Sequence, residues 1–436
     1  MKKKIKVVLV GAGSRANKYA SVSLENPELF EVVGIVDPDP TRRKIIQDRY
    51  QVPDKFCFEQ VEDFLKLDKF ADAVINGTMD HLHVPTSIPI LEKKYDMLLE
   101  KPFAINEDEM WRLVDTANRN KCQVFICHVL RYTPFYSSIK KRILNGEIGD
   151  VISIEMTEHV SYHHMAASFV RGKWRSEKVC YSTMLLQKCC HDMDIMMWMM
   201  NHTTPSAIAS FGSNFQFVPE KKPKQAGSRC MLDCPLNREC PYSAEAHYIE
   251  KPRWEPYVWK CLEGDEDQSI ERKKESLRSD NEYGKCVWDF ERDGNVDHQS
   301  VIVTFQNGAT GTFNLVGGAA DGGRNIHILG TKGEIKGNFE ECRYTIKKIS
   351  PYGKEDYEEE IYDLEVSGDM SAGELLNHGG GDSRLVIDFI HALQGEQASI
   401  SSTNINDSII SHRAVFLAEK SRKNGTIEYF DSNGAE

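Results

Sequence analysis

The apolar positions of the chain follow one pattern up to about residue 129 and another beyond it. In the first part, short apolar runs alternate with longer segments in which apolar residues recur at helical spacing. Buried parallel strands separated by helices give this alternation. We therefore expect a doubly wound α/β domain, with ligands at the carboxyl ends of its strands. The predicted strands are residues 7–10, 31–36, 55–58, 71–78, 96–100 and 122–128, and the predicted helices include 61–67, 84–93 and 106–120.

Beyond residue 129, several runs alternate between apolar and polar side chains, which is typical of strands with one face in water. Asn307-Gly308 lies between two such runs and is a hairpin turn signal. We expect this half to be an α+β domain with a large open sheet, largely antiparallel or mixed. Its predicted strands are 150–160, 207–217, 301–305, 310–316, 326–329, 334–336 and 344–349, and its predicted helices are 136–145, 181–201, 383–393 and 405–423.

Two segments interrupt the second half. Residues 219–284 are charged, carry cysteine and tryptophan, and have the character of an insertion. Residues 352–360 are acidic and predict either a solvated loop or an edge strand. We therefore expect a first domain over residues 1–129 and a second domain over residues 130–436 that contains the insertion.

The composition is that of an ordinary globular protein. The chain of 436 residues exceeds what one core usually organises, and 40% of it is hydrophobic. A net charge of −12 argues against nucleic acid or an anionic membrane as the main partner. Lys2–Lys4 and the apolar run Ile5–Ala12 imitate a signal peptide, but Lys6 interrupts the run, and a first strand explains it fully. We expect the segment to be retained and the protein to be cytoplasmic.

A glycine-rich turn directly follows the first predicted strand. Gly11 permits a sharp turn, Gly13 lets the backbone approach a pyrophosphate, and Ala16 permits close packing of helix on strand. The N–H groups at the start of the following helix would face the phosphates. The sequence therefore predicts a dinucleotide site in which Gly11, Gly13, Ser14 and Arg15 contact the cofactor. The alternative is a βαβ turn that binds nothing.

An acidic residue ends the second predicted strand. This residue, Asp37, can accept hydrogen bonds from the adenosine ribose and would repel a 2′-phosphate, so the expected cofactor is NAD. Arg42 and Arg43 lie close by in the sequence and keep NADP possible.

Two further centres carry candidate chemistry. Lys101 lies in a Glu-Lys-Pro corner after the fifth strand, where it could hydrogen-bond a substrate hydroxyl and assist its deprotonation. Gln187, His191 and Asp194 share one face of a predicted helix, which offers an imidazole as acid or base and groups that bind hydroxyls. The alternatives are a structural lysine at a strand end and a histidine buried in the core.

In this order, after a nucleotide-binding fold, these pieces resemble the glucose–fructose oxidoreductase/inositol dehydrogenase (Gfo/Idh/MocA) family. The resemblance implies oxidation or reduction of a sugar, sugar derivative or polyol with NAD(P). It implies that Lys101 and His191 form the catalytic pair, that Asp194 binds substrate, and that Glu100 and Lys101 lie beside the cofactor. It also implies a dimer or tetramer that buries the outer face of the open sheet. The matching pieces are Gly11–Gly13, Asp37, Glu100–Pro102, Arg131 with Tyr132 and Pro134, Gly146–Gly149 and His191–Asp194.

One position departs from the family pattern. Gln187 stands where polyol dehydrogenases of the family commonly carry aspartate, and an amide can bind a hydroxyl but cannot act as a base. Lys188 could supply part of the missing charge. Three functions therefore stay open: a sugar or polyol oxidoreductase, a redox-neutral enzyme that oxidises a sugar transiently to permit elimination or glycosidic cleavage, and a non-catalytic NAD-sensing regulator on the same fold.

The insertion contains a cysteine cluster. Cys230, Cys234 and Cys240 form a C-x₃-C-x₅-C pattern, and three thiolates so close in sequence could hold a structural zinc ion. Cys261, Cys286 or His247 would be the fourth ligand. A disulfide or free thiols are the alternatives.

Two polar groups of residues have no single interpretation. One group follows the strand at 150–160 and could either line a substrate cleft or form a polar loop; it comprises His159, His163, His164 and Arg171. The other is the run His378–Asp382 before a predicted helix, in which Asp382 is expected to cap that helix.

Overall fold

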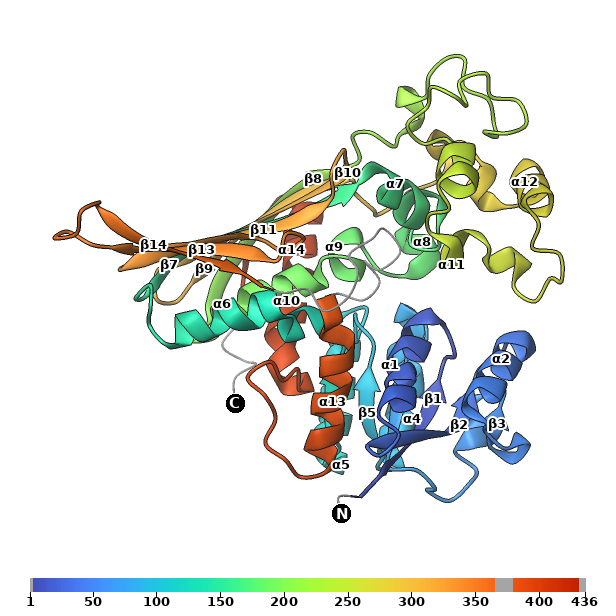
Figure 1. The fold of residues 1–436 in the computed structure, drawn as a ribbon, viewed down its shortest axis with the longest axis horizontal. Helices are drawn as coiled ribbons and strands as arrows, with labels where there is room; N and C mark the ends of the chain where they lie inside the picture. Colours follow the sequence, from blue (N-terminus) through green and yellow to red (C-terminus); the bar gives the residue numbers. More distant parts are fainter. Residues whose placement is uncertain (1–2, 365–378, 431–436) are drawn as a thin grey trace. The chain divides into compact units, whose positions relative to one another are not determined.

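The computed structural model of the protein describes residues 3–364 and 379–430, which form two compact units (Figure 1). The first unit contains the described residues up to Ser137 together with residues 379–413. The second contains residues 138–364 and 414–430. In the described residues, none of the helices has the length and apolar character needed to cross a membrane.

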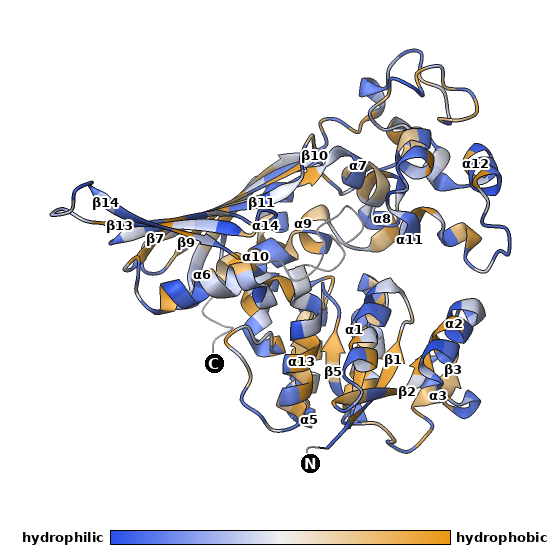
Figure 2. Ribbon diagram, viewed as in Figure 1, coloured by the Kyte–Doolittle hydropathy of each residue, from blue (hydrophilic) through white to orange (hydrophobic). Residues whose placement is uncertain are grey.

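The first unit is built on a six-stranded parallel sheet with the order β3-β2-β1-β4-β5-β6. This order, with crossovers on both sides of β1, is the predicted doubly wound topology. All six predicted strands are present, and Figure 2 shows β1 and β5 as strongly apolar. The strands are β1 (Ile5–Val10), β2 (Phe30–Val36), β3 (Cys57–Phe58), β4 (Ala73–Asn76), β5 (Asp96–Leu99) and β6 (Val124–Ile126).

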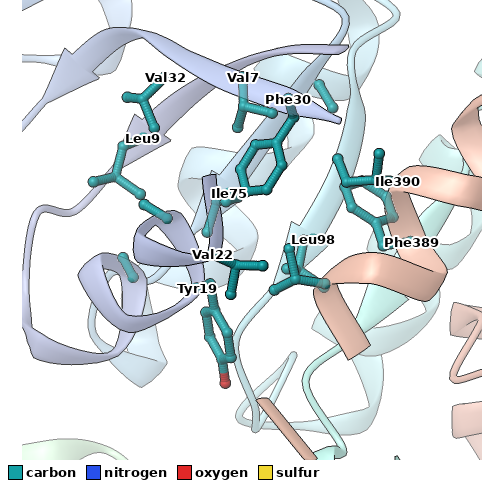
Figure 3. Packing of buried hydrophobic residues seen from close by; sticks show 14 of the residues in the cluster. Val7, Leu9, Tyr19, Val22, Phe30, Val32, Ile75, Leu98, Phe389 and Ile390 are labelled. Carbon is teal, nitrogen blue, oxygen red and sulfur yellow. The ribbon is translucent and has the colours of Figure 1, made fainter. Parts of the chain in front are cut away.

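Helices cover this sheet, and one of them comes from far along the chain. Asn106 caps α5 as predicted, with its side chain accepting from Glu109 N at 2.9 Å. The late helix α13 buries Phe389 and Ile390 in the same core as Tyr19 and Leu98 (Figure 3). The helices are α1 (Ser14–Glu25), α2 (Pro40–Tyr50), α3 (Val61–Phe64), α4 (His83–Glu92), α5 (Glu107–Asn120) and α13 (Gly381–Leu393), with short turns η1 (Asp54–Phe56), η2 (Asp80–Leu82) and η3 (Val129–Tyr132).

The second unit is built on a nine-stranded sheet with the order β14-β13-β12-β11-β7-β10-β9-β8-β15. Only β7 and β10 pair in parallel, so the sheet is mixed, as expected. The acidic segment ends in the edge strand β14. The strands are β7 (Val151–Ser161), β8 (Pro205–Ser213), β9 (His298–Phe305), β10 (Thr310–Ala319), β11 (Gly323–Gly330), β12 (Gly333–Asn338), β13 (Arg343–Ile349), β14 (Tyr357–Asp363) and β15 (Glu428–Tyr429).

The predicted helix over residues 181–201 is wrong in one respect, because the structure has two helices there. α9 (Met184–Gln187) ends before Lys188, and α10 (Cys190–Met199) begins two residues later. Asp192 N bonds to the Cys189 carbonyl only three residues back, so the backbone tightens at the break. α10 packs against β7 and β10. The helices α6 (Pro134–Leu144) and α14 (Ile405–Asn424) each carry residues of both units.

The insertion leaves the sheet after β8 and returns at β9. Ser213 and His298 are register partners, so its two ends meet. Its own small core surrounds Ala167 of the π-helix η4 and includes Tyr248, Val258 and Leu277. Its elements, with those that precede β8, are α7 (Tyr162–His164), η4 (Met165–Arg171), α8 (Glu177–Cys180), η5 (Pro219–Lys221), η6 (Glu245–Glu250), α11 (Glu255–Val258), η7 (Lys260–Leu262), α12 (Ile270–Arg278), η8 (Glu282–Gly284) and η9 (Val287–Asp289).

Candidate active site

The glycine-rich turn after β1 has the geometry of a dinucleotide cradle. Gly11 has a φ of +77°, and a Cβ built on it would lie 2.9 Å from Thr78 N. Gly13 has a φ of −73° and occupies the position before α1, with no side-chain cap. A Cβ on Gly13 would meet no atom within 4 Å, so the helix N-terminus opens onto unfilled space. Backbone N–H groups in such a position suit a pyrophosphate.

Asp37 is fixed against this turn. Its Oδ2 accepts from Ala12 N at 2.7 Å and its Oδ1 from Asp39 N at 2.9 Å, and the carboxylate is buried. The Arg43 guanidinium donates to the Asp37 carbonyl oxygen. A carboxylate has about four lone-pair sites, so these two bonds leave acceptor capacity for a ribose hydroxyl.

Glu100 joins several groups at the end of β5. Its Oε1 accepts from Arg15 Nε at 2.9 Å and from the Tyr19 hydroxyl at 2.7 Å, and its Oε2 accepts from Lys101 N at 2.7 Å. Burial would raise the pKa of Glu100, but the charges of Arg15 and Lys101 lower it below the usual value. Arg15 Nη2 also pairs with Asp382 Oδ1 at 2.6 Å. The network therefore holds an ionised carboxylate directly before Lys101.

The expected role of Asp382 as a helix cap is wrong. Gly380, with a φ of 78°, occupies the N-cap position of α13, and no side chain caps the helix. Asp382 instead lies in the first turn and pairs with Arg15, which also places a negative charge at the positive end of the helix dipole. His378, the first residue of the predicted motif, lies outside the described residues.

Lys101 lies directly after β5, and its charge acts on a buried histidine. Burial, followed by the charges of Arg131 and Lys101, lowers the pKa of His128 well below its usual value. His128 is fully buried and therefore neutral near pH 7. The charge of the lysine after β5 thus adds to the burial that keeps the imidazole after β6 neutral.

The predicted residues of the second centre lie on α9 and α10 of the second unit. The Thr183 hydroxyl caps α9 by accepting from Leu186 N at 3.4 Å. Gln187 is buried, and its amide nitrogen donates to the Trp174 carbonyl at 3.0 Å and to Asn295 Oδ1 at 3.3 Å. His191 and Asp194 are also buried. The amide of Gln187 is therefore held by the protein's own groups.

A buried charge network beside these residues was not predicted. Arg324 on β11 donates to Asp192 Oδ1 at 2.8 Å and pairs with Glu158 Oε2 on β7 at 2.6 Å. Lys188 pairs with Glu158 Oε1 at 3.0 Å. Burial raises the pKa of Asp192 to about 6, Glu158 adds to the effect, and Arg324 opposes it. The sequence did carry a signal, because Glu158 falls in register with the apolar residues of its strand.

Of the predicted polar group, His159 lies within β7 itself, and the other members contact the insertion. His164 stacks on Trp254 of the insertion at 4.2 Å between ring centroids, and His163 Nδ1 accepts from Trp254 Nε1 at 3.1 Å. Burial, then the neighbouring cations, lowers the pKa of His163 to about 4. Arg171 is buried and contacts Cys230. His163, His164 and Arg171 therefore pack with the insertion and do not form a polar loop.

The expected zinc site has no support. Cys230, Cys234 and Cys240 carry free thiols. Across residues 3–364 and 379–430, no three His, Cys, Asp or Glu side chains form a group that could hold a metal ion. A zinc ion needs all its ligands at about 2.0–2.3 Å from one point. Of the alternatives, the structure has the free thiols.

The structure thus gathers the predicted residues into two separate sets. Those of the first unit are Gly11, Gly13, Ser14, Arg15, Asp37, Glu100 and Lys101, and those of the second are Gln187, His191 and Asp194. The two family models divide these ten site residues in the same way. Residues 5–128 match the model of an oxidoreductase family with an NAD-binding Rossmann fold, and residues 140–429 match the C-terminal alpha/beta domain of the same family.

Individual relatives are distant. The protein YteT of Bacillus subtilis (strain 168) is 25% identical over 342 residues, which cover 76% of each chain. Inositol 2-dehydrogenase of Corynebacterium glutamicum (strain R) is 22% identical over 200 residues, which cover 46% of this chain and 55% of the relative. Glucose-6-phosphate 3-dehydrogenase of Bacillus subtilis (strain 168) is 23% identical over 60% of this chain and 78% of its own length.

Solved structures share the fold over nearly the whole chain. An NAD-binding oxidoreductase from Klebsiella pneumoniae matches with a TM-score of 0.70 at 14% identity, over 99% of this chain and 100% of that one. The WlbA dehydrogenase of Bordetella pertussis, in complex with NADH and UDP-GlcNAcA, matches with a TM-score of 0.65 at 15% identity, over 98% of each chain. With its glycine-rich turn, its mixed second sheet and both family domains in order, the chain belongs to the Gfo/Idh/MocA oxidoreductase family.

Proposed function

We propose that the protein is an NAD-dependent oxidoreductase that transfers a hydride between the coenzyme and a sugar, sugar derivative or polyol. The observation that carries the proposal is the pairing of an open glycine cradle with a fixed acid: Gly13 faces unfilled space, and Asp37 is bonded to the same turn. Inositol and glucose-6-phosphate dehydrogenases among the relatives support the substrate class.

In this proposal the first unit holds the coenzyme. The N-terminus of α1 at Gly13 and Ser14 binds the pyrophosphate, and Asp37 accepts from the adenosine ribose. Because Asp37 is buried and already bonded to backbone N–H groups, a 2′-phosphate there would place two anions together. NAD is therefore preferred to NADP. When bound, the coenzyme supplies the hydride acceptor or donor.

Lys101 and His191 are proposed to handle the substrate proton. A lysine can stabilise negative charge on a hydroxyl oxygen, and an imidazole can take or give the proton. Asp194 would bind another hydroxyl. Gln187 would position its neighbours, because its amide already bonds to Trp174 and Asn295.

The neutral amide of Gln187 favours a second candidate function, a redox-neutral enzyme. With a neutral amide at position 187, the second centre lacks the carboxylate that commonly assists the histidine in polyol dehydrogenases of the family. A redox-neutral enzyme would oxidise a sugar transiently, use the acidified neighbouring C–H for elimination or glycosidic cleavage, and return the hydride. A non-catalytic NAD sensor is the third candidate.

The discriminating experiment measures NADH over a panel of sugars, sugar phosphates, glycosides and polyols. A simple dehydrogenase accumulates one NADH per substrate oxidised, whereas a redox-neutral enzyme releases product without net NADH. A sensor binds NAD and converts nothing. The same panel with NADP tests the preference assigned to Asp37.

Lys101→Ala tests the catalytic role. We expect turnover to fall by about 10²–10⁴-fold, the usual contribution of an acid–base group, while NAD affinity stays within about twofold. Lys93→Ala, on an exposed lysine after α4, is the matched control. Near-normal turnover in Lys101→Ala would reject the assignment, and a parallel loss of NAD binding would place the residue in the coenzyme site instead.

We also propose that the protein works in the cytoplasm as a homo-oligomer. All twelve cysteines are free, which suits a reducing compartment. The open sheet of the second unit supplies the surface for self-association, as argued below.

A further inference from the structure

Four cysteines, three in the insertion and one two residues after it, surround one cavity. Cys230, Cys234, Cys240 and Cys286 all line a cavity of about 230 Å³, together with Arg171. A single water needs only about 10–15 Å³ measured in the same way. Three of these cysteines belong to the C-x₃-C-x₅-C pattern, and the fourth lies 46 residues after Cys240.

Two sets of backbone hydrogen bonds, one non-local and one local, bring the four together. Arg229 and Lys285 form an isolated antiparallel bridge, with Cys230 N donating to Gly284 O and Cys286 N to Ser228 O, both at 2.9 Å. A turn then closes the other pair, with Cys240 N donating to Leu236 O at 2.9 Å. Prolines follow Cys234 and Cys240 directly. A Cys-Pro step also ends one common ligand run for iron–sulfur clusters.

The buried arginine at this cavity has an unbalanced charge. Arg171 is only 1% exposed and donates to the carbonyls of Lys285 and Tyr242, the Tyr248 hydroxyl and, at 3.4 Å, Cys230 Sγ. None of the carboxylates in the described ranges forms an ion pair with it. A buried cation without an anion is costly, so the site favours a negatively charged occupant.

We propose that these four cysteines hold an iron–sulfur cluster of the four-iron, four-sulfide type. Such a cluster takes four cysteine thiolates and carries its own sulfides, so it is larger than one ion and keeps its ligands further apart. This accounts for the size of the cavity that the four cysteines line.

The surroundings match the needs of such a cluster. Four thiolates make the assembly anionic, which balances Arg171. Hydrogen bonds from Arg171 Nη2 to Cys230 Sγ and from Tyr242 N to Cys240 Sγ, both 3.4 Å, are of the kind that tune cluster potential. Arg171 ends η4, so the cluster would fasten the insertion to the segment that follows β7. The proposal is independent of the proposed activity.

The test is metal and sulfide analysis of the full-length protein, produced with iron supplied and purified without oxygen. We expect about four iron and about four acid-labile sulfide per chain, with visible absorbance that dithionite bleaches. Cys234→Ser and Cys286→Ser should each lose most of the iron. Cys261→Ser is the matched control, because Cys261 lies in the same insertion, is exposed and does not line the cavity; it should keep its iron.

The wild-type measurement stands even if a variant fails to fold. Protein that contains neither iron nor sulfide, or one equivalent of zinc, would overturn the proposal. So would a disulfide among the four cysteines, detected by mass spectrometry of the oxygen-free sample.

Discussion

Gly11 and Gly13 stand in one turn but differ in what a methyl group would meet. At Gly11 the left-handed φ and the contact with Thr78 N leave no room for a side chain, whereas at Gly13 the space is unfilled. We expect Gly11→Ala to lower the free energy of unfolding by about 1–3 kcal/mol. Gly13→Ala should change it by less than about 0.5 kcal/mol but weaken NAD binding at least tenfold.

Urea unfolding and calorimetric titration with NAD check this pair. Each variant serves as the control for the other, since both add the same methyl group. Full NAD affinity in a stable Gly13→Ala protein would show that the pyrophosphate does not approach this backbone.

At the residue scale, the sequence predicted the local backbone of the glycine-rich turn, whereas the cofactor contacts assigned to it stay predictions. Gly11, Gly13 and Asp37 follow directly from the strand–turn–helix pattern. The partners of Arg15 and Asp192 did not, because Asp382 and Arg324 come from distant parts of the chain. The assumption that Asp382 caps its helix failed for the same reason: a distant cation competes for its carboxylate.

At the scale of elements, the chain breaks between α9 and α10, where the apolar periodicity predicted a single helix over residues 181–201. Lys188 and Asp192 on either side of it pair with groups on β7 and β11, so the network ties the helices to the sheet. The spacing of apolar residues could not predict this break, because apolar residues continue through both helices. Only the ion pairs of Lys188 and Asp192, which the sequence does not reveal, distinguish the position of the break.

This network predicts a pH-dependent stability. The pKa of Asp192 is raised from 3.8 to about 6, so the folded state keeps a proton that the unfolded state releases. The contribution of Asp192 to stability therefore falls as pH rises from about 4 to 6. Asp192→Asn stays neutral and can still accept from Arg324. As pH rises from 4 to 7, the free energy of unfolding of Asp192→Asn should therefore increase by about 1–3 kcal/mol relative to that of the wild type.

Urea unfolding at several pH values measures that difference. Asp48→Asn, on the exposed face of α2, is the control and should run parallel to the wild type. Curves for Asp192→Asn that are also parallel to the wild type would mean that Asp192 is ionised throughout.

At the scale of the whole molecule, one face of the nine-stranded sheet presents apolar side chains to solvent. Register places Phe211, Ile302 and Val316 on the same side of β8, β9 and β10, and they are 70%, 49% and 41% exposed. The other side carries the core residues Val303 and Phe313. A second copy of the chain is the expected cover for this face.

The double variant Phe211→Glu, Ile302→Glu should therefore reduce the molar mass in light scattering to that of one chain, 49.7 kDa. Each chain would contribute two glutamates, so a symmetric contact between two chains would have to bury four carboxylates, which is costly. Tyr352→Glu, on a fully exposed residue before β14, should keep the wild-type mass. An unchanged mass in the double variant would locate the contact elsewhere.

The sequence predicted the two sheets because each depends on patterns within single strands. It did not predict that α13 joins the core of the first unit, since β7 to β14 of the second sheet separate that helix from the parallel sheet in sequence. It grouped Cys230, Cys234 and Cys240 but left Cys261, Cys286 and His247 open as the fourth member, because the bridge between Arg229 and Lys285 that brings Cys286 to the cavity is non-local.

The insertion departs from Ser213 and re-enters at His298, and these two residues face each other across the β8–β9 ladder. The ladder is therefore a hairpin whose loop happens to be very long. The register of this ladder is set by paired residues along the whole of β8 and β9, from Pro205–Phe305 to Ser213–His298, so the loop can lengthen, shorten or disappear while the sheet keeps its alignment. Such a junction is where evolution, or a protein engineer, can splice in a new module.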